Sequence, residues 1–92
     1  MKCQIVISDE AKLDIREAKN YYAKLDIKLA KRYIVDISET IDLLSENPTH
    51  HQLRYKSIRI AFTNTFPYGI HYTLENKIVY IHRVFHTKRF FK

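Results

Sequence analysis

The sequence of 92 residues has one glycine, one cysteine, two prolines and no tryptophan. Because Gly69 is the only glycine, the chain has no glycine-rich phosphate loop and no Gly-x-Ser-x-Gly elbow. These absences exclude P-loop ATPases, Rossmann oxidoreductases and serine hydrolases built on that elbow. Cys3 cannot form an internal disulfide, which fits a reducing compartment. No apolar run approaches the roughly 18 residues of a membrane span, and acids stand where a signal peptide is apolar, so we expect a cytoplasmic protein.

Hydrophobic residues make up 46% of the chain and aromatic residues 13%, a composition typical of one folded domain, here expected over residues 1–92. The net charge of +6 is unevenly distributed. Residues 1–50 carry eight basic and nine acidic side chains, whereas residues 51–92 carry eight basic side chains and one acid, Glu75. This asymmetry predicts an anionic partner such as nucleic acid, an acidic protein segment or a nucleic-acid-bound enzyme. The alternative is a solvated basic face that aids solubility.

Hydrophobic periodicity predicts the order of secondary-structure elements. Ser8 is suited to cap a first helix, and Asp26 to cap a second that stops before Asn47-Pro48. Beyond residue 52 the apolar period changes to two, as in strands. The expected elements are a strand at 3–7, helices at 9–23 and from 26 to about 46, strands near 58–63, 68–75 and 78–85, and a basic tail at 86–92.

Each expected helix carries one apolar stripe that must be buried. The stripes are Ala11, Ile15, Ala18 and Tyr22 on the first helix, and Ile27, Ala30, Ile34, Ile37, Ile41 and Leu44 on the second. The fewest layers that bury both are a helical hairpin on one face of a small, mainly antiparallel sheet. We therefore predict an α+β fold in the order β-α-α-β-β-β, with room for one further strand, and expect the other face of the sheet to serve function.

The histidines and acids do not predict a metal site. His82 and His86 are four residues apart on an expected strand, which separates them by roughly 13 Å, too far for one zinc ion. The pair His50-His51 follows Pro48 and fits a solvated connector. The helical acids, namely Asp14, Glu17, Asp36 and Glu39, are expected on solvated faces, paired with nearby lysines and arginines. We expect no metal and no cofactor.

A cationic and aromatic cluster remains near the end of the chain. Its members are Arg54, Arg59, Tyr68, His71, His82, Arg83, His86, Lys88 and Arg89. A metal-independent nuclease could use such groups, since arginine and lysine stabilise a phosphorane while histidine or tyrosine moves protons. The alternative is that the tyrosines are half-buried strand residues and the charges are solvated at the rim.

The same region resembles the RelE/ParE toxin family. The matching segments are Phe66-Pro67-Tyr68-Gly69-Ile70-His71-Tyr72, Asn76-Lys77-Ile78-Val79-Tyr80-Ile81 and Val84-Phe85-His86-Thr87-Lys88-Arg89, with Ala11, Leu13, Asp14, Ile15, Tyr21-Tyr22, Leu44 and Asn47-Pro48 in the helices. The resemblance covers nearly the whole chain. It implies the toxin of a bacterial type II toxin–antitoxin pair, neutralised by a cognate antitoxin in a hetero-oligomer.

The family has two branches with different targets. RelE-like members cleave mRNA on the ribosome, whereas ParE-like members poison DNA gyrase. The chain has Gly69 where RelE-like enzymes carry an arginine, and Phe90 or Phe91 where they carry a catalytic tyrosine, so it resembles the ParE and plasmid-stabilisation branch more closely. His86 matches a histidine that some ribonuclease relatives use, which keeps the nuclease alternative open.

The resemblance implies three sets of site residues. For target binding we expect Arg59, Tyr68, His86, Lys88 and Arg89. A ribosome-dependent nuclease would instead use His86 as general base, with Arg59 or Arg83 as electrostatic stabiliser. For the antitoxin we expect Tyr21, Tyr33 and Leu43, although large side chains on small domains are often half exposed for no such reason. A third reading is a degenerate member that only binds its antitoxin.

Overall fold

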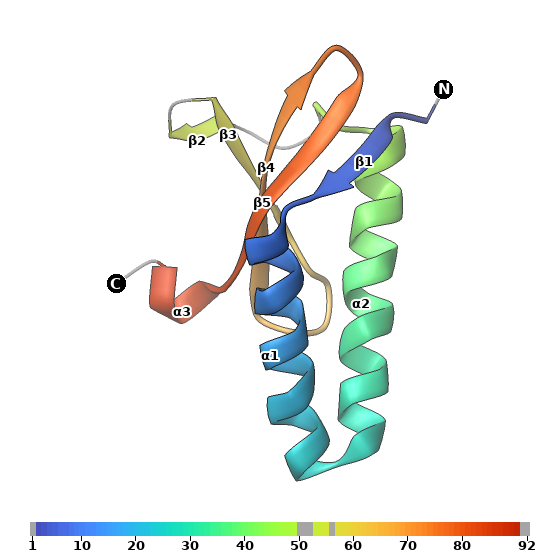
Figure 1. Cartoon of the computed structure of the whole chain (residues 1–92), viewed down its shortest axis with the longest axis vertical. Helices are drawn as coiled ribbons and strands as arrows, with labels where there is room; N and C mark the ends of the chain where they lie inside the picture. The colour runs from blue at the N-terminus through green and yellow to red at the C-terminus, as the bar shows by residue number, and fades with distance from the viewer. Residues whose placement is uncertain (1, 50–52, 56, 91–92) are drawn as a thin grey trace.

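The computed structural model describes residues 2–49, 53–55 and 57–90. Its elements are β1 (Gln4–Ile7), α1 (Asp9–Leu25), α2 (Ile27–Glu46), β2 (Leu53–Tyr55), β3 (Ile58–Phe62), β4 (Tyr68–Glu75), β5 (Ile78–His86) and α3 (Thr87–Phe90). Figure 1 shows α1 and α2 as a hairpin that extends past one end of the sheet. The predicted element order is confirmed, with four strands after the hairpin, and the basic tail begins with one helical turn that the sequence did not predict.

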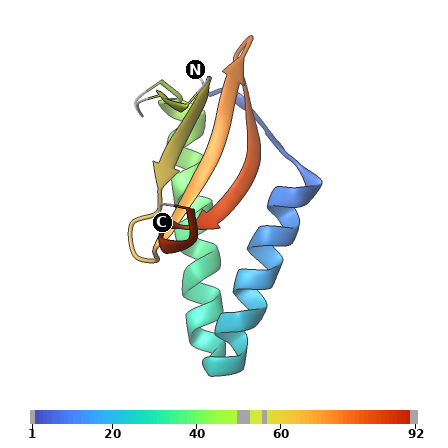
Figure 2. The same ribbon diagram turned by 90° about the vertical axis from the view of Figure 1, so that its left-hand side faces the viewer.

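The five strands form one mixed sheet in the order β1-β5-β4-β3-β2. β1 pairs parallel with β5, and the other neighbours pair antiparallel. Figure 2 shows both long helices on one side of this sheet. The predicted α+β fold, a helical hairpin on one face of a mainly antiparallel sheet, is therefore confirmed. Because β1 lies beside β5, the start of the chain is placed against its last strand.

One residue, Asp26, joins the two helices and caps both of them. Its backbone N–H donates to the Tyr22 carbonyl at the end of α1, at 2.8 Å. Its carboxylate accepts from the backbone N–H of Lys28 at the start of α2, at 2.9 Å. Asp26 itself is extended, with φ −168° and ψ 123°. The predicted cap is thus confirmed, and α1 runs to Leu25 rather than to residue 23 because the same aspartate ends it.

The core lies between the hairpin and the covered face of the sheet. Its buried apolar residues are Ala11, Ala18, Ala30, Tyr33, Ile37, Leu44, Ala61, Tyr68, Ile70, Tyr72, Val79, Ile81 and Val84. Both predicted helical stripes point into it, with one error. Ile27 is 58% exposed, because it opens α2 at the tip of the hairpin, beyond the end of the sheet. The sequence stripe also missed Tyr33, Asp36 and Thr40 of α2, which are buried.

The sheet face turned away from the helices is not an open surface at its centre. Ile60 and His71 are cross-strand neighbours, and His71 lies between the core residues Ile70 and Tyr72. Alternation therefore turns both side chains to that second face. Their exposures are nevertheless 1% and 2%. The expectation of a functional surface across this face is wrong at this position.

Candidate functional site

The C-terminal half of β5 is held by α1 where β1 no longer reaches it. The pairing between β1 and β5 ends at Ile7 and Ile81. Ser8 continues the contact, because its backbone N–H donates to the Ile81 carbonyl at 2.9 Å and its hydroxyl donates to the His82 carbonyl at 2.8 Å. The same hydroxyl oxygen accepts from the backbone N–H of Ala11 at 3.0 Å. Ser8 therefore ends the strand pairing and begins α1 at one point.

Asp14, further along α1, also bonds to β5. Its Oδ2 accepts from the backbone N–H of Val84 at 2.9 Å and from Nε of Arg83 at 2.8 Å, and its Oδ1 accepts from Nη2 of Arg83 at 2.9 Å. Such a bidentate, charge-assisted pair is among the stronger polar contacts in proteins. The expectation that Asp14 lies on a solvated face is wrong, since its side chain is 12% exposed and replaces a missing strand partner.

This arrangement also fixes Arg83. Hydrogen bonding to Asp14 raises the pKa of the guanidinium above its usual value. The guanidinium carbon also lies 4.5 Å from the centroid of the Phe85 ring, within cation–π distance. An arginine that stabilises phosphate charge must turn its N–H groups toward the phosphate. In Arg83, Nε and Nη2 instead donate to Asp14 and so hold β5 against α1.

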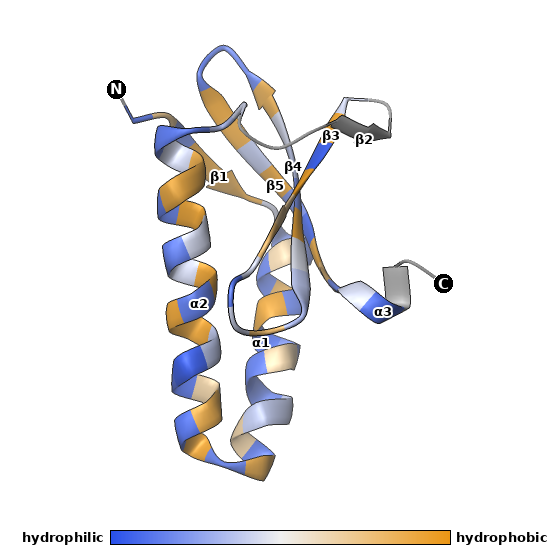
Figure 3. Ribbon diagram, turned by 180° about the vertical axis from the view of Figure 1, so that it is seen from behind, coloured by the Kyte–Doolittle hydropathy of each residue, from blue (hydrophilic) through white to orange (hydrophobic). Residues whose placement is uncertain are grey.

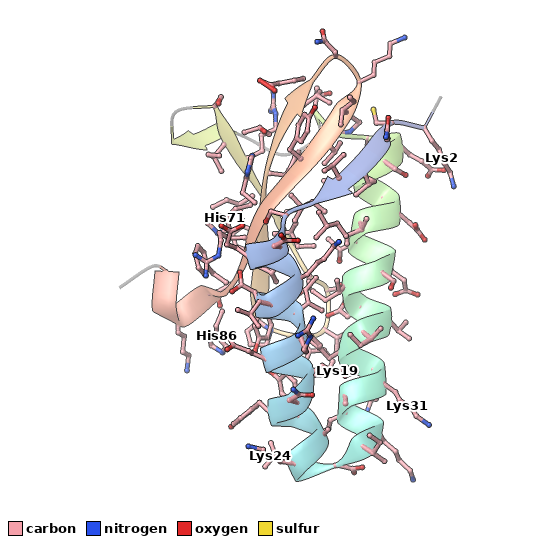
Figure 4. All side chains as sticks on the ribbon, viewed as in Figure 1. Lys2, Lys19, Lys24, Lys31, His71 and His86 are labelled. Carbon is pink, nitrogen blue, oxygen red and sulfur yellow. The ribbon has the colours of Figure 1, made fainter. Side chains whose placement is uncertain are left out.

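A hollow of about 430 Å³ opens between α1 and the end of β5. Its lining residues are Asp14, Glu17, Ala18, Tyr21, Tyr68, His86 and Lys88. Figure 4 shows His86 beside α1. The hollow therefore brings together three of the residues expected to bind the target, namely Tyr68, His86 and Lys88, with Tyr21, expected to bind the antitoxin. Tyr68 is only 6% exposed, so it contributes an edge of the wall rather than a projecting side chain.

His86 is held in a defined orientation at this hollow. Its Nδ1 accepts from the backbone N–H of Lys88 at 3.2 Å, and its ring packs edge-on against Tyr68 with centroids 5.3 Å apart. In a neutral imidazole one nitrogen accepts and the other carries the proton. With Nδ1 as the acceptor, neutral His86 carries its proton on Nε2. In that tautomer Nε2 is the hydrogen-bond donor of the ring.

Arg59 does not lie at the hollow. It pairs with Tyr72 in the register of β3 and β4, whereas His86 pairs with Tyr68. Four residues along β4 correspond to about 13 Å. The positive charge of Arg59 acts on Tyr72 instead, where it opposes the burial that raises the pKa of that phenol to about 12. The structure thus separates Arg59 from the other residues expected at the target site, and the side chain of Arg89 lies outside the described part of the structure.

The residues expected to bind an antitoxin do not share one surface. Tyr33 is 0% exposed, so its assignment to an exposed contact is wrong. Its ring packs against Phe66 and Tyr68, with centroids 5.6 and 5.0 Å away. Tyr21 and Leu43 are 60% and 61% exposed, as the prediction requires. Tyr21 lines the hollow beside α1, whereas Leu43 lines a separate hollow beside α2.

Asp36 is a second buried carboxylate that the sequence placed in solvent. It is 4% exposed and accepts from three successive backbone N–H groups of the loop between β3 and β4. Its Oδ1 binds the amide of Asn64 at 3.1 Å, and its Oδ2 binds those of Thr65 and Phe66 at 3.0 and 2.8 Å. The expectation of a solvated Asp36 is therefore wrong, and this carboxylate fixes the loop against α2.

His71 and His82 contact neighbouring side chains of the sheet. Burial lowers the pKa of His71, and the neighbouring Arg83 charge lowers it further. Its ring packs edge-on against Phe85 at 5.0 Å. His82 forms a 2.8 Å hydrogen bond between its Nε2 and the Thr73 hydroxyl. The pair His50-His51 lies outside the described residues. Within the described residues, no three His, Cys, Asp or Glu side chains gather into a possible metal site.

The positions of Asp14 and Asp36 relative to the apolar stripes of the helices could have indicated that both are largely buried. Asp14 is three residues after Ala11 and four before Ala18, so it belongs to the same buried stripe of α1. Asp36 precedes Ile37 by one residue, and also lies four residues before Thr40, which places it at the border of the α2 stripe. A charged residue inside an apolar stripe indicates a partner to be found elsewhere in the chain. Which partner it is depends on strand register, and that is not visible in the sequence.

The fold is that of a small α+β domain with a helical hairpin on one face of a mixed sheet. Over residues 5–91 the chain matches the family described as the ParE toxin of the type II toxin-antitoxin system parDE, and it belongs to that family. None of the described helices is long and apolar enough to cross a bilayer. Comparison with curated protein sequences finds no significant match.

Solved structures share the fold at low sequence identity. The chromosomal ParDE system from P. aeruginosa superposes with a TM-score of 0.79 at 16% identity, over 90% of this chain and 94% of the other. YafQ from E. coli strain BL21(DE3) gives 0.66 at 19% identity, over 99% and 100%. The E. coli DinJ-YafQ toxin-antitoxin complex gives 0.64 at 18% identity, over the whole of both chains. These matches support the fold and, at such identities, nothing finer.

Proposed function

We propose that the chain acts as a cytoplasmic toxin that binds and poisons DNA gyrase, and that a cognate antitoxin neutralises it. The observation that supports this most is the set of charges around the hollow beside α1. Asp14 and Glu17 line it opposite His86 and Lys88. Asp14 is already paired with Arg83, but the exposed carboxylate of Glu17 repels the phosphates of an RNA substrate, whereas a protein surface can offer both signs of charge.

The state of the two candidate catalytic groups supports the same choice. Arg83 donates hydrogen bonds to Asp14, and Nδ1 of His86 accepts a hydrogen bond from the backbone N–H of Lys88. A nuclease reaction would need the arginine on the phosphate and an unprotonated nitrogen near the ribose hydroxyl. Gly69 also stands where the related ribonucleases carry an arginine. The site therefore favours binding over catalysis, with His86 and Lys88 as the contacts that the described residues offer.

The experiment is expression under tight control without an antitoxin, followed by two assays on purified protein. We expect growth arrest, gyrase-dependent double-strand breaks and intact mRNA. Lys88→Ala combined with Arg89→Ala should abolish arrest in a folded protein. The matched control is Lys19→Ala combined with Lys24→Ala, two exposed cations of α1, which should leave it intact. A fully toxic, well-folded tail variant would refute the assignment of the tail.

A ribosome-dependent endoribonuclease remains the second candidate because His86 and Lys88 line one hollow with Tyr68. The two candidates differ in what His86→Gln does. Glutamine keeps a hydrogen-bond donor but cannot serve as a base, so a binding contact should survive this change in part, whereas nuclease activity should disappear. Cleaved mRNA with intact DNA would establish the nuclease. The absence of growth arrest would indicate a member that only binds its antitoxin.

Membership in a toxin–antitoxin family supports an antitoxin as a partner more directly than any other partner proposed above. We place it at exposed apolar side chains, with Tyr21 and Leu43 as the first candidates. Tyr21→Ser and Leu43→Ser should each weaken a purified toxin–antitoxin complex without unfolding the toxin, since both side chains are mostly exposed. Unchanged affinity in both variants would show that the antitoxin binds elsewhere.

A further inference from the structure

The outward side of α2 presents a continuous ridge of exposed residues. Positions four apart form such ridges on a helix, and here they are Ile27, Lys31, Val35, Glu39 and Leu43. The three apolar members are 58%, 53% and 61% exposed, which places them among the most exposed large hydrophobic side chains of the described residues. Figure 3 shows apolar and polar bands alternating along α2. Packing within a single copy of the described chain does not account for apolar residues at this spacing on a solvent face.

The ridge is self-complementary about Val35. Lys31 and Glu39 lie four residues to either side of it, and Ile27 and Leu43 lie eight residues to either side. Read backwards, the ridge therefore matches apolar with apolar and positive with negative. Exposed residues beside the ridge show the same symmetry. Lys28 lies seven residues before Val35 and Asp42 lies seven residues after it, so a positive charge again matches a negative one. The first half of α2 is basic at its surface and the second half acidic.

Two shallow hollows run along the ridge, where the loop between β3 and β4 approaches α2. One, of about 280 Å³, is lined by Lys31, Val35 and Glu39 among others. The next, of about 400 Å³, is lined by Glu39, Leu43 and Phe62 among others. Both include Asp36, whose bonds to the loop fix their common floor. A second helix laid along the ridge thus has a groove beside it to fill.

We propose that this ridge is the contact between two copies of the chain. The α2 helices cross antiparallel about a two-fold axis at Val35, with the ridges of positions four apart packed alongside each other at a crossing angle of about 50°. Val35 contacts Val35 of the other copy, Ile27 contacts Leu43 of the other copy, and Lys31 pairs with Glu39 of the other copy. Because Leu43 is also a proposed antitoxin contact, dimerisation and antitoxin binding at Leu43 exclude each other. Each pairing occurs twice, as two-fold symmetry requires.

Charge complementarity selects a second copy over an unlike partner. An unlike partner needs a complementary surface but places no constraint on how one half of α2 relates to the other. A two-fold contact does, because the residue at a given distance before the axis must match the residue at the same distance after it. The sequence around Val35 meets that constraint. Charge reverses at four and at seven residues to either side of Val35, and apolar residues recur at eight.

The test is sedimentation of the full chain over a range of concentrations, with circular dichroism to verify folding. We expect a monomer–dimer equilibrium that Val35→Asp abolishes. Lys31→Glu and Glu39→Lys should each weaken dimerisation by about tenfold or more, because each places like charges opposite one another twice. The matched control is Lys19→Glu, a charge reversal on the exposed surface of α1, which should leave the dimer unchanged.

Mixing the two single variants gives the decisive result. In the homodimer of Lys31→Glu the introduced carboxylate faces the native Glu39 of the other copy, and in that of Glu39→Lys two lysines face each other. When the variants are mixed, each contact between unlike chains joins one lysine with one glutamate, so the heterodimer should be as stable as the native dimer. The double variant Lys31→Glu, Glu39→Lys should also recover dimerisation.

Two outcomes would overturn the proposal. One is a native chain that stays monomeric at every concentration, and the other is a pair of single variants that fail to associate when mixed. The readout is mass alone, so it does not depend on the proposed toxin target.

Discussion

Replacing Tyr33 or Tyr72 with phenylalanine removes the same oxygen from two side chains that are both 0% exposed, yet we expect opposite effects on stability. The Tyr72 hydroxyl donates to the Pro48 carbonyl at 2.6 Å, and so ties β4 to the segment after α2. The Tyr33 hydroxyl is buried and has no hydrogen-bond partner among the described residues. The two variants therefore compare a satisfied buried hydroxyl with an unsatisfied one.

The expected magnitudes follow from this difference. Tyr72→Phe leaves the Pro48 carbonyl without its donor and should lower the free energy of unfolding by about 1 to 2 kcal/mol. Tyr33 gives up its bonds to water on burial and gains none, and that desolvation costs roughly 1 to 3 kcal/mol. Tyr33→Phe removes the cost, while the small vacancy it leaves loses some packing. We expect it to be neutral or stabilising by up to about 1 kcal/mol.

The assay is urea unfolding of the full chain at neutral pH, with equal m-values as evidence that both variants unfold in the same way. The native chain and the double variant complete a cycle in which the two effects should add, since the hydroxyl groups have different surroundings. If Tyr33→Phe destabilises as much as Tyr72→Phe, the Tyr33 hydroxyl has a partner after all and the reasoning is wrong.

The same tyrosines predict how stability depends on alkaline pH. Burial raises the pKa of Tyr72 to about 12 and also raises that of Tyr33. Tyrosines in the unfolded chain ionise near pH 10. Above that pH the unfolded state binds fewer protons than the folded state, so stability is fully present below about pH 10 and is lost as pH rises toward about 12. Each phenylalanine variant should reduce this slope by up to about 1.4 kcal/mol per pH unit, measured by urea unfolding between about pH 9 and 11.

Three further substitutions test the contacts that shape the site. Asp36→Ala should lower unfolding free energy by about 3 kcal/mol, because three loop amides lose their acceptor, whereas Glu46→Ala, which changes an exposed acid of the same helix, should stay within about 0.5 kcal/mol. Asp14→Ala should cost about 2 kcal/mol against almost nothing for Glu17→Ala, and equal effects would contradict the role of Asp14 as a strand partner. Gly69→Ala should cost about 1 to 3 kcal/mol in thermal unfolding, because the added Cβ would stand 2.9 Å from an isoleucine methyl carbon, and an unchanged Tm would show that this contact relaxes freely.

Local signals in the sequence were sufficient for most of the fold. The caps at Ser8 and Asp26 and the change from a helical period to a period of two located every long element to within about two residues. β2 and α3 are too short for a period to develop, so the sequence did not predict them as elements. The exposure of Ile27 was missed for another reason: periodicity tells which side of a helix is apolar, but not where the sheet beneath it ends.

The site was predictable only where chain neighbours determine it. His86 and Lys88 are two residues apart and share one hollow. Arg59 was grouped with them because of its charge, and the register of β3 and β4 places it elsewhere. The Asp14 contact with Arg83 joins residues 69 apart in sequence, and no local pattern specifies such a pairing. Tyr33 was misassigned because a bulky residue beside an apolar stripe can face either way until the neighbouring loop is placed.

The position of β1 beside β5 has a consequence for how the chain is made. Ser8 bonds to His82, 74 residues later, so the strand that leaves the ribosome first waits for the strand that leaves it last among those described. Closing a segment of that length is an entropically costly, late event in folding. Until then β1 has no parallel partner, Asp14 has no arginine and the hollow beside α1 has only one wall. Any partner that recognises this hollow therefore binds a finished chain and not a nascent one.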